Sequence, residues 1–262
     1  MKRIVLLFLM LCLQCNLFAC LILFLTDGKE IWVGNHEDWY AVDAEVTFIP
    51  GQKGKFGMVY FDFKSEGYAQ GGMNTEGLFF DGTKTPYAPY PENNIKKDCD
   101  CYIWTKVLQE CVTVESAINY IKTYKIPEIE DVHILLADKK GNSAIVGIYE
   151  GKLQIHHRTG NSQLLTNFNI ANPSYGGELP CSRFDTAQQM LLRDSTASLK
   201  NLESILSKTT QDELTIYSNI YNLTRGEVYV YHLASSTKKK KFNLKEELKK
   251  GRHAMMIDAL FN

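Results

Sequence analysis

The alternation of apolar and polar positions predicts short β-strands over most of the chain. The stretch from Cys20 to Leu25 is wholly apolar, so we expect a strand that is buried on both faces. Asp27-Gly28 then predicts a hairpin turn. The full set of expected strands is 20–25, 30–35, 46–50, 56–63, 78–81, 132–137, 143–149, 153–157, 164–167, 215–222 and 227–232.

Four segments instead have apolar residues at helical spacing. They predict two pairs of helices, over residues 104–111, 115–124, 184–193 and 199–207. Thr113 is expected to cap the second helix, and residues 243–250 are expected to form one or two final helical turns. Because helix pairs alternate with runs of strands, we expect an α+β fold. Its architecture would be a four-layer αββα sandwich, with two antiparallel sheets face to face and the helix pairs outside.

Residues 1–19 have the three parts of a secretory signal. Lys2 and Arg3 form a positive end, residues 4–13 form an apolar stretch too short to span a bilayer, and Ala19 supplies a small residue at the end. We therefore interpret residues 1–19 as a removable signal peptide and residues 20–262 as one domain. The protein is expected to be exported, to the periplasm or medium of a bacterium.

Composition adds limits on the class of partner. The chain of 262 residues is 45% hydrophobic and 23% charged, which is ordinary for a globular protein. The net charge is −1, and it becomes −3 once Lys2 and Arg3 are removed, so no nucleic acid partner is expected. The basic run Lys238–Lys241 is interpreted as a solvated loop or hairpin tip.

Seven cysteines occur, of which Cys12 and Cys15 lie in the predicted signal. The other five are an odd number, so pairing of four would leave one free thiol, which would be Cys20. We interpret the other four cysteines as core thiols or disulfide partners. They are Cys99, Cys101, Cys111 and Cys181. Cys99 and Cys101 are too close for an ordinary zinc knuckle, and neither a metal site nor a cofactor is expected.

Cys20 carries the main chemical signal. A cut after Ala19 would make it the first residue of the mature chain, with a thiol and a free α-amine on one residue. An α-amine has a reference pKa near ~8, so it can accept the thiol proton close to neutral pH. The sequence thus predicts a nucleophile that carries its own proton acceptor.

Five short sequence motifs occur along the chain in the same order as in a known family. They are the strand from Cys20 with Gly34-Asn35-His36-Glu37-Asp38-Trp39, the segment Gly72-Met73-Asn74-Thr75-Glu76-Gly77-Leu78, Leu165-Thr166-Asn167, Ser182-Arg183-Phe184, and the closing hairpin 215–231. Together they resemble the choloylglycine hydrolases, which are the bile salt hydrolases and penicillin V acylases of the N-terminal-nucleophile (Ntn) superfamily. The resemblance covers nearly all of residues 20–245. The chain is also similar to the branch of isopenicillin N acyltransferases and acid-ceramidase-like enzymes.

This resemblance implies a role for each matching residue. Cys20 would be the nucleophile, and Asp38 would hold its α-amine by a charge-assisted hydrogen bond. Asn167 would donate its side-chain amide to an oxyanion hole. Arg183 would lie beside the thiol and favour the thiolate, because a nearby cation lowers a thiol pKa.

The chain departs from the family pattern at two positions. Asn35 stands where the family usually has Arg, beside the nucleophile, and Lys84 stands at or near a second oxyanion or substrate position. We expect both Asn35 and Lys84 to contact substrate. A lysine at position 84 would favour an anionic substrate group, or would point to solvent.

The function implied is hydrolysis of a linear carbon–nitrogen amide bond in a small N-acyl amide, through a thioester on Cys20. A pocket lined from Tyr40, Phe63, Phe80 and the 87–90 loop would accept an apolar or aromatic acyl group. The alternative is a surface lipoprotein whose acylated Cys20 anchors a non-catalytic binding domain to the membrane. A papain-like Cys–His dyad is disfavoured, since none of the six histidines has a recognisable cysteine-protease context.

Overall fold

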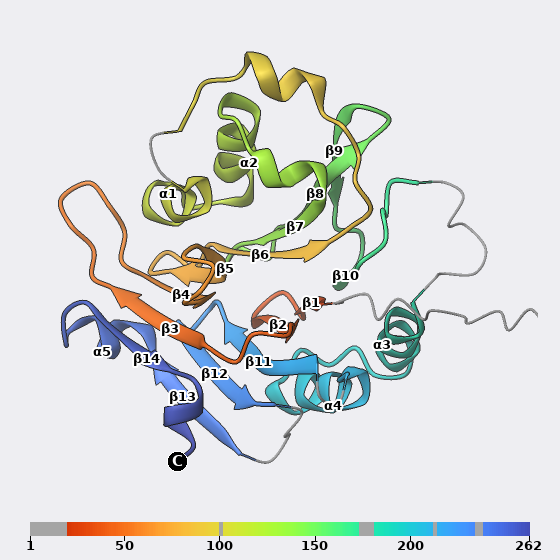
Figure 1. Cartoon of the computed structure of the whole chain (residues 1–262). Helices are drawn as coiled ribbons and strands as arrows, with labels where there is room; N and C mark the ends of the chain where they lie inside the picture. The colour runs from red at the N-terminus through yellow and green to blue at the C-terminus, as the bar shows by residue number, and fades with distance from the viewer. Residues whose placement is uncertain (1–19, 100–101, 173–180, 212–213, 234–237) are drawn as a thin grey trace, which may run out of the picture.

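The computed structural model describes residues 20–99, 102–172, 181–211, 214–233 and 238–262 (Figure 1). The predicted signal peptide, residues 1–19, and Cys101 lie outside the described residues. Within the described part of the chain, no helix is long and apolar enough to cross a membrane.

Two antiparallel sheets form the centre of the molecule. The six-stranded sheet has the order β10-β1-β2-β11-β12-β13, with β1 (Leu21–Thr26), β2 (Ile31–Asp38), β10 (Ser162–Leu165), β11 (Thr215–Asn222), β12 (Glu227–His232) and β13 (Lys239–Asn243). The eight-stranded sheet has the order β14-β3-β4-β5-β6-β7-β8-β9. Its strands are β3 (Ala44–Ile49), β4 (Met58–Phe63), β5 (Ala69–Asn74), β6 (Phe79–Lys84), β7 (Val132–Ala137), β8 (Ser143–Tyr149), β9 (Lys152–His157) and β14 (His253–Met256).

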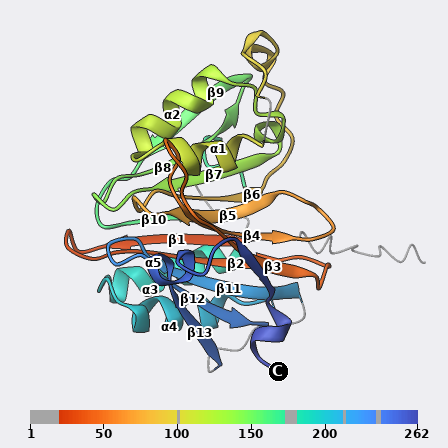
Figure 2. The same ribbon diagram turned by 90° about the vertical axis from the view of Figure 1, so that its left-hand side faces the viewer.

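Two pairs of helices cover the outer faces of the sheets (Figure 2). Helices α1 (Ile103–Glu110) and α2 (Val114–Thr123) pack on the eight-stranded sheet, and α3 (Ser182–Arg193) and α4 (Leu199–Thr209) pack on the six-stranded sheet. Shorter helical segments are α5 (Leu244–Leu248), η1 (Pro91–Ile95), η2 (Pro127–Glu130) and η5 (Asp258–Leu260). The expected αββα sandwich is therefore confirmed. Thr113 caps α2 as expected, in a reciprocal capping box with Ser116.

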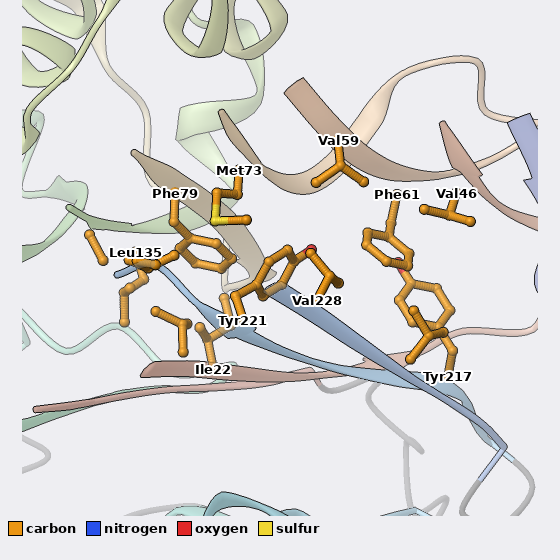
Figure 3. Close-up of a cluster of buried hydrophobic side chains, with 14 of the residues drawn as sticks. Ile22, Val46, Val59, Phe61, Met73, Phe79, Leu135, Tyr217, Tyr221 and Val228 are labelled. Atoms are coloured by element: carbon orange, nitrogen blue, oxygen red, sulfur yellow. The ribbon is translucent and has the colours of Figure 1, made fainter. Parts of the chain in front are cut away.

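Apolar side chains from both sheets meet in the middle layer (Figure 3). Phe61 and Phe79 come from the eight-stranded sheet, while Tyr217 and Tyr221 come from β11 of the six-stranded sheet. The ring centroids of Phe79 and Tyr221 are 4.9 Å apart in an edge-on arrangement, and those of Phe61 and Tyr217 are 5.4 Å apart. This core fixes the two sheets against each other, and the candidate site lies where β1 and β2 meet it.

Three strands were not predicted, namely β5, β13 and β14. β5 contains Gly71 and Gly72, which have low strand propensity, but a Cβ on Gly72 would lie 2.4 Å from the Val59 carbonyl oxygen on β4. The glycines are thus what lets β5 pair closely with its neighbours.

β13 corrects part of our interpretation of Lys238–Lys241 as a solvated loop or hairpin tip, since Lys239–Lys241 belong to a strand. Residues 239–241 are exposed on an edge strand that pairs with β12, and exposed lysines protect such an edge from association.

The cysteines outside the predicted site take ordinary packing positions where they are described. Cys111 is buried under α1 and α2, and Cys99 packs against the same cluster. Cys181 is half-buried against the cluster under α3 and α4. Among the described residues, no group of three or more His, Cys, Asp or Glu is arranged to hold a metal ion.

Candidate active site

Cys20 lies at the start of β1, next to the point where Leu21 pairs with His36 on β2. The Asp27-Gly28 turn forms as predicted, with Gly28 at a φ of 86° that favours glycine. The side chain of Cys20 is buried, with 8% of its surface exposed. Its thiol donates a hydrogen bond to Glu37 Oε1, with an Sγ to Oε1 distance of 3.6 Å.

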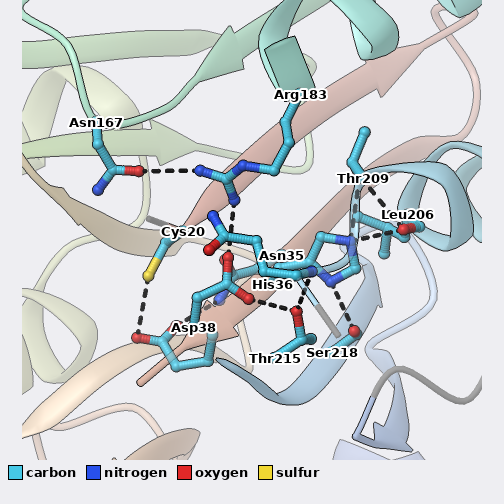
Figure 4. Close-up of polar contacts among 12 residues, drawn as sticks. Cys20, Asn35, His36, Asp38, Asn167, Arg183, Leu206, Thr209, Thr215 and Ser218 are labelled. Carbon is cyan, nitrogen blue, oxygen red and sulfur yellow. Dashed lines mark hydrogen bonds and ion pairs between the residues drawn. The ribbon is translucent and has the colours of Figure 1, made fainter. Parts of the chain in front are cut away.

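Asp38, Arg183 and Asn167 meet beside Cys20, although they come from distant parts of the chain (Figure 4). Asp38 Oδ2 accepts a hydrogen bond from Arg183 Nη1 at 2.7 Å, and Asp38 Oδ1 accepts one from the Thr215 hydroxyl at 2.5 Å. Arg183 Nη2 donates to Asn167 Oδ1 at 3.4 Å. The four residues that the sequence predicted as catalytic therefore lie in one cluster. Their catalytic roles stay predictions.

Burial and nearby carboxyl groups act on the pKa of the Cys20 thiol. Burial raises the pKa of the Cys20 thiol well above its ordinary value, and the charges of Glu37 and Asp38 raise it further. A backbone hydrogen bond from Asp38 opposes this rise. The Arg183 guanidinium lies against Asp38 and Asn167 (Figure 4). Its expected effect on the thiol pKa stays a prediction.

The Asp38 side chain is buried, with 0% of its surface exposed, at the edge of the pocket described below. Burial raises its pKa to about 6, and the hydrogen bond from Thr215 and the charge of Arg183 both act against this rise. Each ionised carboxylate oxygen has two acceptor positions. Asp38 therefore retains acceptor capacity after binding Arg183 and Thr215, which a nearby α-ammonium could use.

Asn167 and Lys84 contact each other across the site. Asn167 Nδ2 donates to the Lys84 carbonyl oxygen at 2.8 Å, so one N–H of the expected oxyanion donor is used inside the protein. The ammonium of Lys84 pairs with Asp131 at the pocket, and its side chain is 59% exposed. Substrate binding by Lys84 stays a prediction. Its charge already has a partner, however, which weakens the argument for an anionic substrate.

Asn35 is completely buried. Its Nδ2 donates a hydrogen bond to Glu37 Oε2 at 2.9 Å. The other oxygen of the same carboxyl group, Glu37 Oε1, accepts the hydrogen bond from the Cys20 thiol. It is not among the residues that line the pocket. A direct contact between Asn35 and substrate therefore stays a prediction, while its contact with Glu37 is part of the described structure.

A pocket of about 320 Å³ opens in front of Cys20. Its apolar wall is largely aromatic and contains Trp39, Phe63, Tyr68, Phe80, Tyr102 and Trp104. The polar lining includes Glu37, Asp38, Lys84, Glu128 and Asp131. The predicted contribution of Phe63 and Phe80 is confirmed.

Three tyrosines that were expected in this pocket do not line it. Tyr40 and Tyr87 are 65% and 67% exposed, and Tyr90 is buried in the core under α1 and α2. The wall is instead built by residues that the sequence did not single out. Trp104 from α1 stacks on Phe80 with ring centroids 5.2 Å apart, and Tyr68 lies beside Tyr102 with centroids 5.4 Å apart.

Sequence analysis also missed two buried carboxyl groups, Glu37 and Asp81. Burial raises the pKa of Glu37 to about 7, and it raises the pKa of Asp81, on which the charge of Glu37 acts in the same direction. The predicted strand ended at Asn35, whereas β2 continues to Asp38, so Glu37 is a buried strand residue. Two consecutive acidic residues after an apolar strand were the available signal.

His36 points to the opposite side of the sheet. Its Nδ1 lies 2.7 Å from the Ser218 hydroxyl and its Nε2 lies 2.7 Å from the Leu206 carbonyl oxygen, beneath α4. Burial lowers its pKa to about 4, so the ring is neutral at pH 7. His36 thus serves the packing of α4, and the thiol partner seen in the structure is Glu37.

Comparison with known proteins assigns the chain to a family. The family model described as acyl-coenzyme A:6-aminopenicillanic acid acyl-transferase matches residues 26–244. No sequence among the curated proteins matches the chain. A search of solved structures finds similar folds, three of which are described below, each at less than 25% sequence identity.

A mutant of the conjugated bile acid hydrolase from Clostridium perfringens has a TM-score of 0.68 and 18% identity, covering 90% of this chain and 95% of that one. The penicillin V acylase from Agrobacterium tumefaciens has a TM-score of 0.63 and 16% identity, with 87% and 86% covered. The Caenorhabditis elegans orthologue of N-acylethanolamine-hydrolyzing acid amidase has a TM-score of 0.59 and 13% identity, with 78% and 93% covered.

The family model covers most of the domain, and the solved structures share its two-sheet architecture. The predicted relation to the choloylglycine hydrolases and the Ntn superfamily is confirmed, and with it the class of enzyme that acts on acyl amides. The chain belongs to the acyl-coenzyme A:6-aminopenicillanic acid acyl-transferase family.

Proposed function

We propose that this protein is an exported cysteine amidase that hydrolyses a linear amide bond of a small N-acyl amide. Removal of residues 1–19 would make Cys20 the N-terminal nucleophile. The observation that carries the proposal is the position of Cys20, whose buried thiol lies in the floor of an aromatic pocket beside Asp38, Arg183 and Asn167.

The chemistry is acyl transfer through a thioester. The Cys20 sulfur attacks the amide carbonyl carbon, and its proton passes to the α-amine. The resulting oxyanion is stabilised by the Asn167 side-chain amide and a backbone N–H, where each such donor typically contributes ~3 kcal/mol. The α-ammonium gives a proton to the leaving amine, and water then hydrolyses the thioester to release the carboxylate.

Asp38 and Arg183 orient these groups in the proposal. The Asp38 carboxylate holds the α-ammonium, which fixes its direction toward the sulfur and the leaving group. Arg183 keeps that carboxylate in place through the 2.7 Å ion pair. It also orients the Asn167 side chain by donating a hydrogen bond to Asn167 Oδ1. A direct effect of Arg183 on the thiol pKa stays a separate prediction.

The pocket lining supports an aromatic or apolar acyl group. Phe63, Phe80 and Trp104 offer flat apolar surface next to Cys20, and about 320 Å³ is enough for a small ring system. Among the printed names of similar structures are a bile acid hydrolase, a penicillin V acylase and an N-acylethanolamine-hydrolyzing amidase. We propose the same general class of substrate here, an N-acyl amide.

The buried position of Cys20 argues against the lipoprotein alternative. A diacylglyceryl group on the sulfur would have to leave a site in which the residue is only 8% exposed and its thiol contacts Glu37. Acylation of the α-amine would also remove the proposed proton acceptor. Membrane association is therefore expected only if Cys20 is lipidated, which this proposal does not include.

A panel of amides tests the function. The mature protein would be assayed against pairs of amides that share an amine and differ in the acyl group, from acetyl to phenylacetyl and phenoxyacetyl. We expect hydrolysis that prefers the aromatic acyl groups and disappears in Cys20→Ala. A matched control is Cys111→Ala, which removes a buried thiol outside the pocket. A preference for small polar acyl groups would contradict the substrate proposal, and full activity in Cys20→Ala would contradict the nucleophile.

A further inference from the structure

Glu128 lies in the wall of the pocket among aromatic side chains. It belongs to η2, and its Oε1 accepts a hydrogen bond from the indole N–H of Trp104 at 2.7 Å. Tyr68 and Tyr102 line the same pocket. Burial raises the pKa of both tyrosines, and the charge of Glu128 acts on them in the same direction. The carboxylate is thus bound to one aromatic side chain and lies near two others.

Two ion pairs account for most of the other charge around the pocket. The Lys84 ammonium pairs with Asp131, and the Asp38 carboxylate pairs with Arg183. Each pair combines one positive and one negative charge, so neither adds net charge to the pocket. The partner of Lys84 is Asp131, so this lysine does not balance Glu128.

The remaining acidic group, Glu37, lies at the Cys20 end of the pocket. It accepts hydrogen bonds from the Cys20 thiol and from the Asn35 amide. In the proposed amidase, the α-amine that exchanges a proton with this thiol would lie at the same end. Glu37 therefore belongs to the surroundings of the nucleophile, and Glu128 is the acidic group of the aromatic wall.

The Glu128 carboxylate has no counterion in the described part of the chain. None of the ion pairs there includes it. Burial raises its pKa, which the hydrogen bond from Trp104 opposes. A partly buried carboxylate without a counterion is costly, and a cationic ligand would offset that cost. Aromatic faces also attract ammonium groups that lie within about 6 Å of the ring centroid.

We propose that Glu128 is a specificity-determining residue that selects an acyl group bearing an ammonium, held between its carboxylate and the neighbouring aromatic rings. This inference rests on the proposed amidase function and narrows its substrate class. The substrate is an N-acyl amide whose apolar or aromatic acyl group ends in a cation. Glu128 binds this cation and takes no part in the bond changes at Cys20. The charge preference is the reverse of the one that Lys84 alone would suggest.

The first test compares three amides of one amine, whose phenylacetyl groups carry a para-aminomethyl, para-ethyl or para-carboxyl substituent. The ethyl group matches the shape of the aminomethyl group without its charge. We expect the mature protein to favour the aminomethyl amide over the ethyl amide about tenfold in kcat/KM, mainly through KM, since tenfold corresponds to about 1.4 kcal/mol of binding. The carboxyl amide should be the poorest substrate.

Glu128→Gln removes the charge and keeps an oxygen that can accept the hydrogen bond from Trp104. We expect the aminomethyl preference to fall to about twofold in this variant, the remainder reflecting the aromatic rings. Glu130→Gln is the matched control. It removes a carboxylate from the same η2 segment, which bonds the Tyr90 backbone and does not line the pocket, so the preference should persist. A wild-type enzyme without the preference, or a preference unchanged in Glu128→Gln, would overturn the proposal.

A second measurement needs no hydrolysis. The mature Cys20→Ala protein would be titrated in a calorimeter with phenethylamine and with phenethyl alcohol, its neutral analogue. We expect phenethylamine to bind about tenfold more tightly, and the added change Glu128→Gln to abolish the difference. Equal binding of the two compounds, or no binding of phenethylamine, would contradict the cation site. If phenethylamine binding depends on Glu128 but no amide is hydrolysed, the amidase proposal fails while the cation site stands.

Discussion

The carboxylate of Asp38 and the guanidinium of Arg183 form a buried ion pair, with Oδ2 and Nη1 2.7 Å apart and 145 residues between them in the chain. The two side chains are 0% and 11% exposed, respectively. The pair ties the end of β2 to the first turn of α3 directly beside Cys20. The position of the α3 helix and the geometry of the candidate site therefore depend on the same contact.

Removal of one partner of this pair should destabilise the protein. Arg183→Gln leaves the Asp38 carboxylate buried without its cation, and breaking a buried ion pair typically costs about 3–5 kcal/mol. Urea denaturation would measure the free energy of unfolding. The double variant Asp38→Asn with Arg183→Gln should recover part of the loss, since no unpaired charge remains. Equal losses that simply add in the double variant would show that the two side chains do not interact.

Gly71 and Asp81 are expected to show a strong steric coupling. They lie opposite each other on β5 and β6, and a Cβ on Gly71 would be 2.2 Å from Asp81 Oδ2. Gly71→Ala should lower stability by about 1–3 kcal/mol, the usual cost of overpacking. Shortening the opposing side chain in Gly71→Ala with Asp81→Ala should remove the clash, so the two changes together should cost less than their sum. Strict additivity in this double-mutant cycle would contradict the described register.

The pH dependence of stability should change in Asp62→Asn. Burial, with the charges of Glu45 and Asp43, raises the pKa of Asp62 from 3.8 to about 6 in the folded protein. The folded state therefore binds this proton more tightly than the unfolded state, and wild type loses stability as the pH rises from 3.8 through 6. Because Asp62 is partly exposed, we expect the variant to be more stable by only about 1 kcal/mol at pH 8. Urea titrations should show that this advantage disappears near pH 4, and an advantage that grew toward low pH would have the wrong sign.

Lys84 should influence substrate charge only weakly while Asp131 holds it. The pair is at the pocket, and the two side chains are 59% and 35% exposed. Asp131→Asn would release the ammonium, so we expect KM to fall about threefold for an amide with an anionic group and to stay constant for its neutral analogue. The effect should shrink in 0.5 M salt, because exposed charges are screened. Equal changes for both amides would indicate that Lys84 does not face the substrate.

The sequence was sufficient to predict the layers, because apolar periodicity was readable locally. Its family motifs also selected Cys20, Asp38, Asn167 and Arg183, which the structure brings together and whose catalytic roles stay predictions. It was not sufficient for contacts that depend on three-dimensional pairing. β5 was missed because Gly71 and Gly72 look unfavourable until their close approach to β4 and β6 is known. Glu37 was missed because its burial depends on β2 running to Asp38.

The pocket shows the same limit. Phe63 and Phe80 were identified. Tyr102 and Trp104 reach the pocket only through the packing of α1 on the eight-stranded sheet, and Tyr68 reaches it from the connection between β4 and β5. Tyr40 and Tyr87 have the composition of a binding wall and are nevertheless exposed. Residue type alone did not distinguish these two groups.

The central claim is that Cys20 becomes the free N-terminal residue of the mature protein. The most direct measurement is the intact mass and N-terminal residue of the protein exported from a Gram-negative host. We predict a chain that starts at Cys20 with an unmodified amine and thiol. A diacylglyceryl adduct on Cys20, or a mature chain that starts at another residue, would contradict the account.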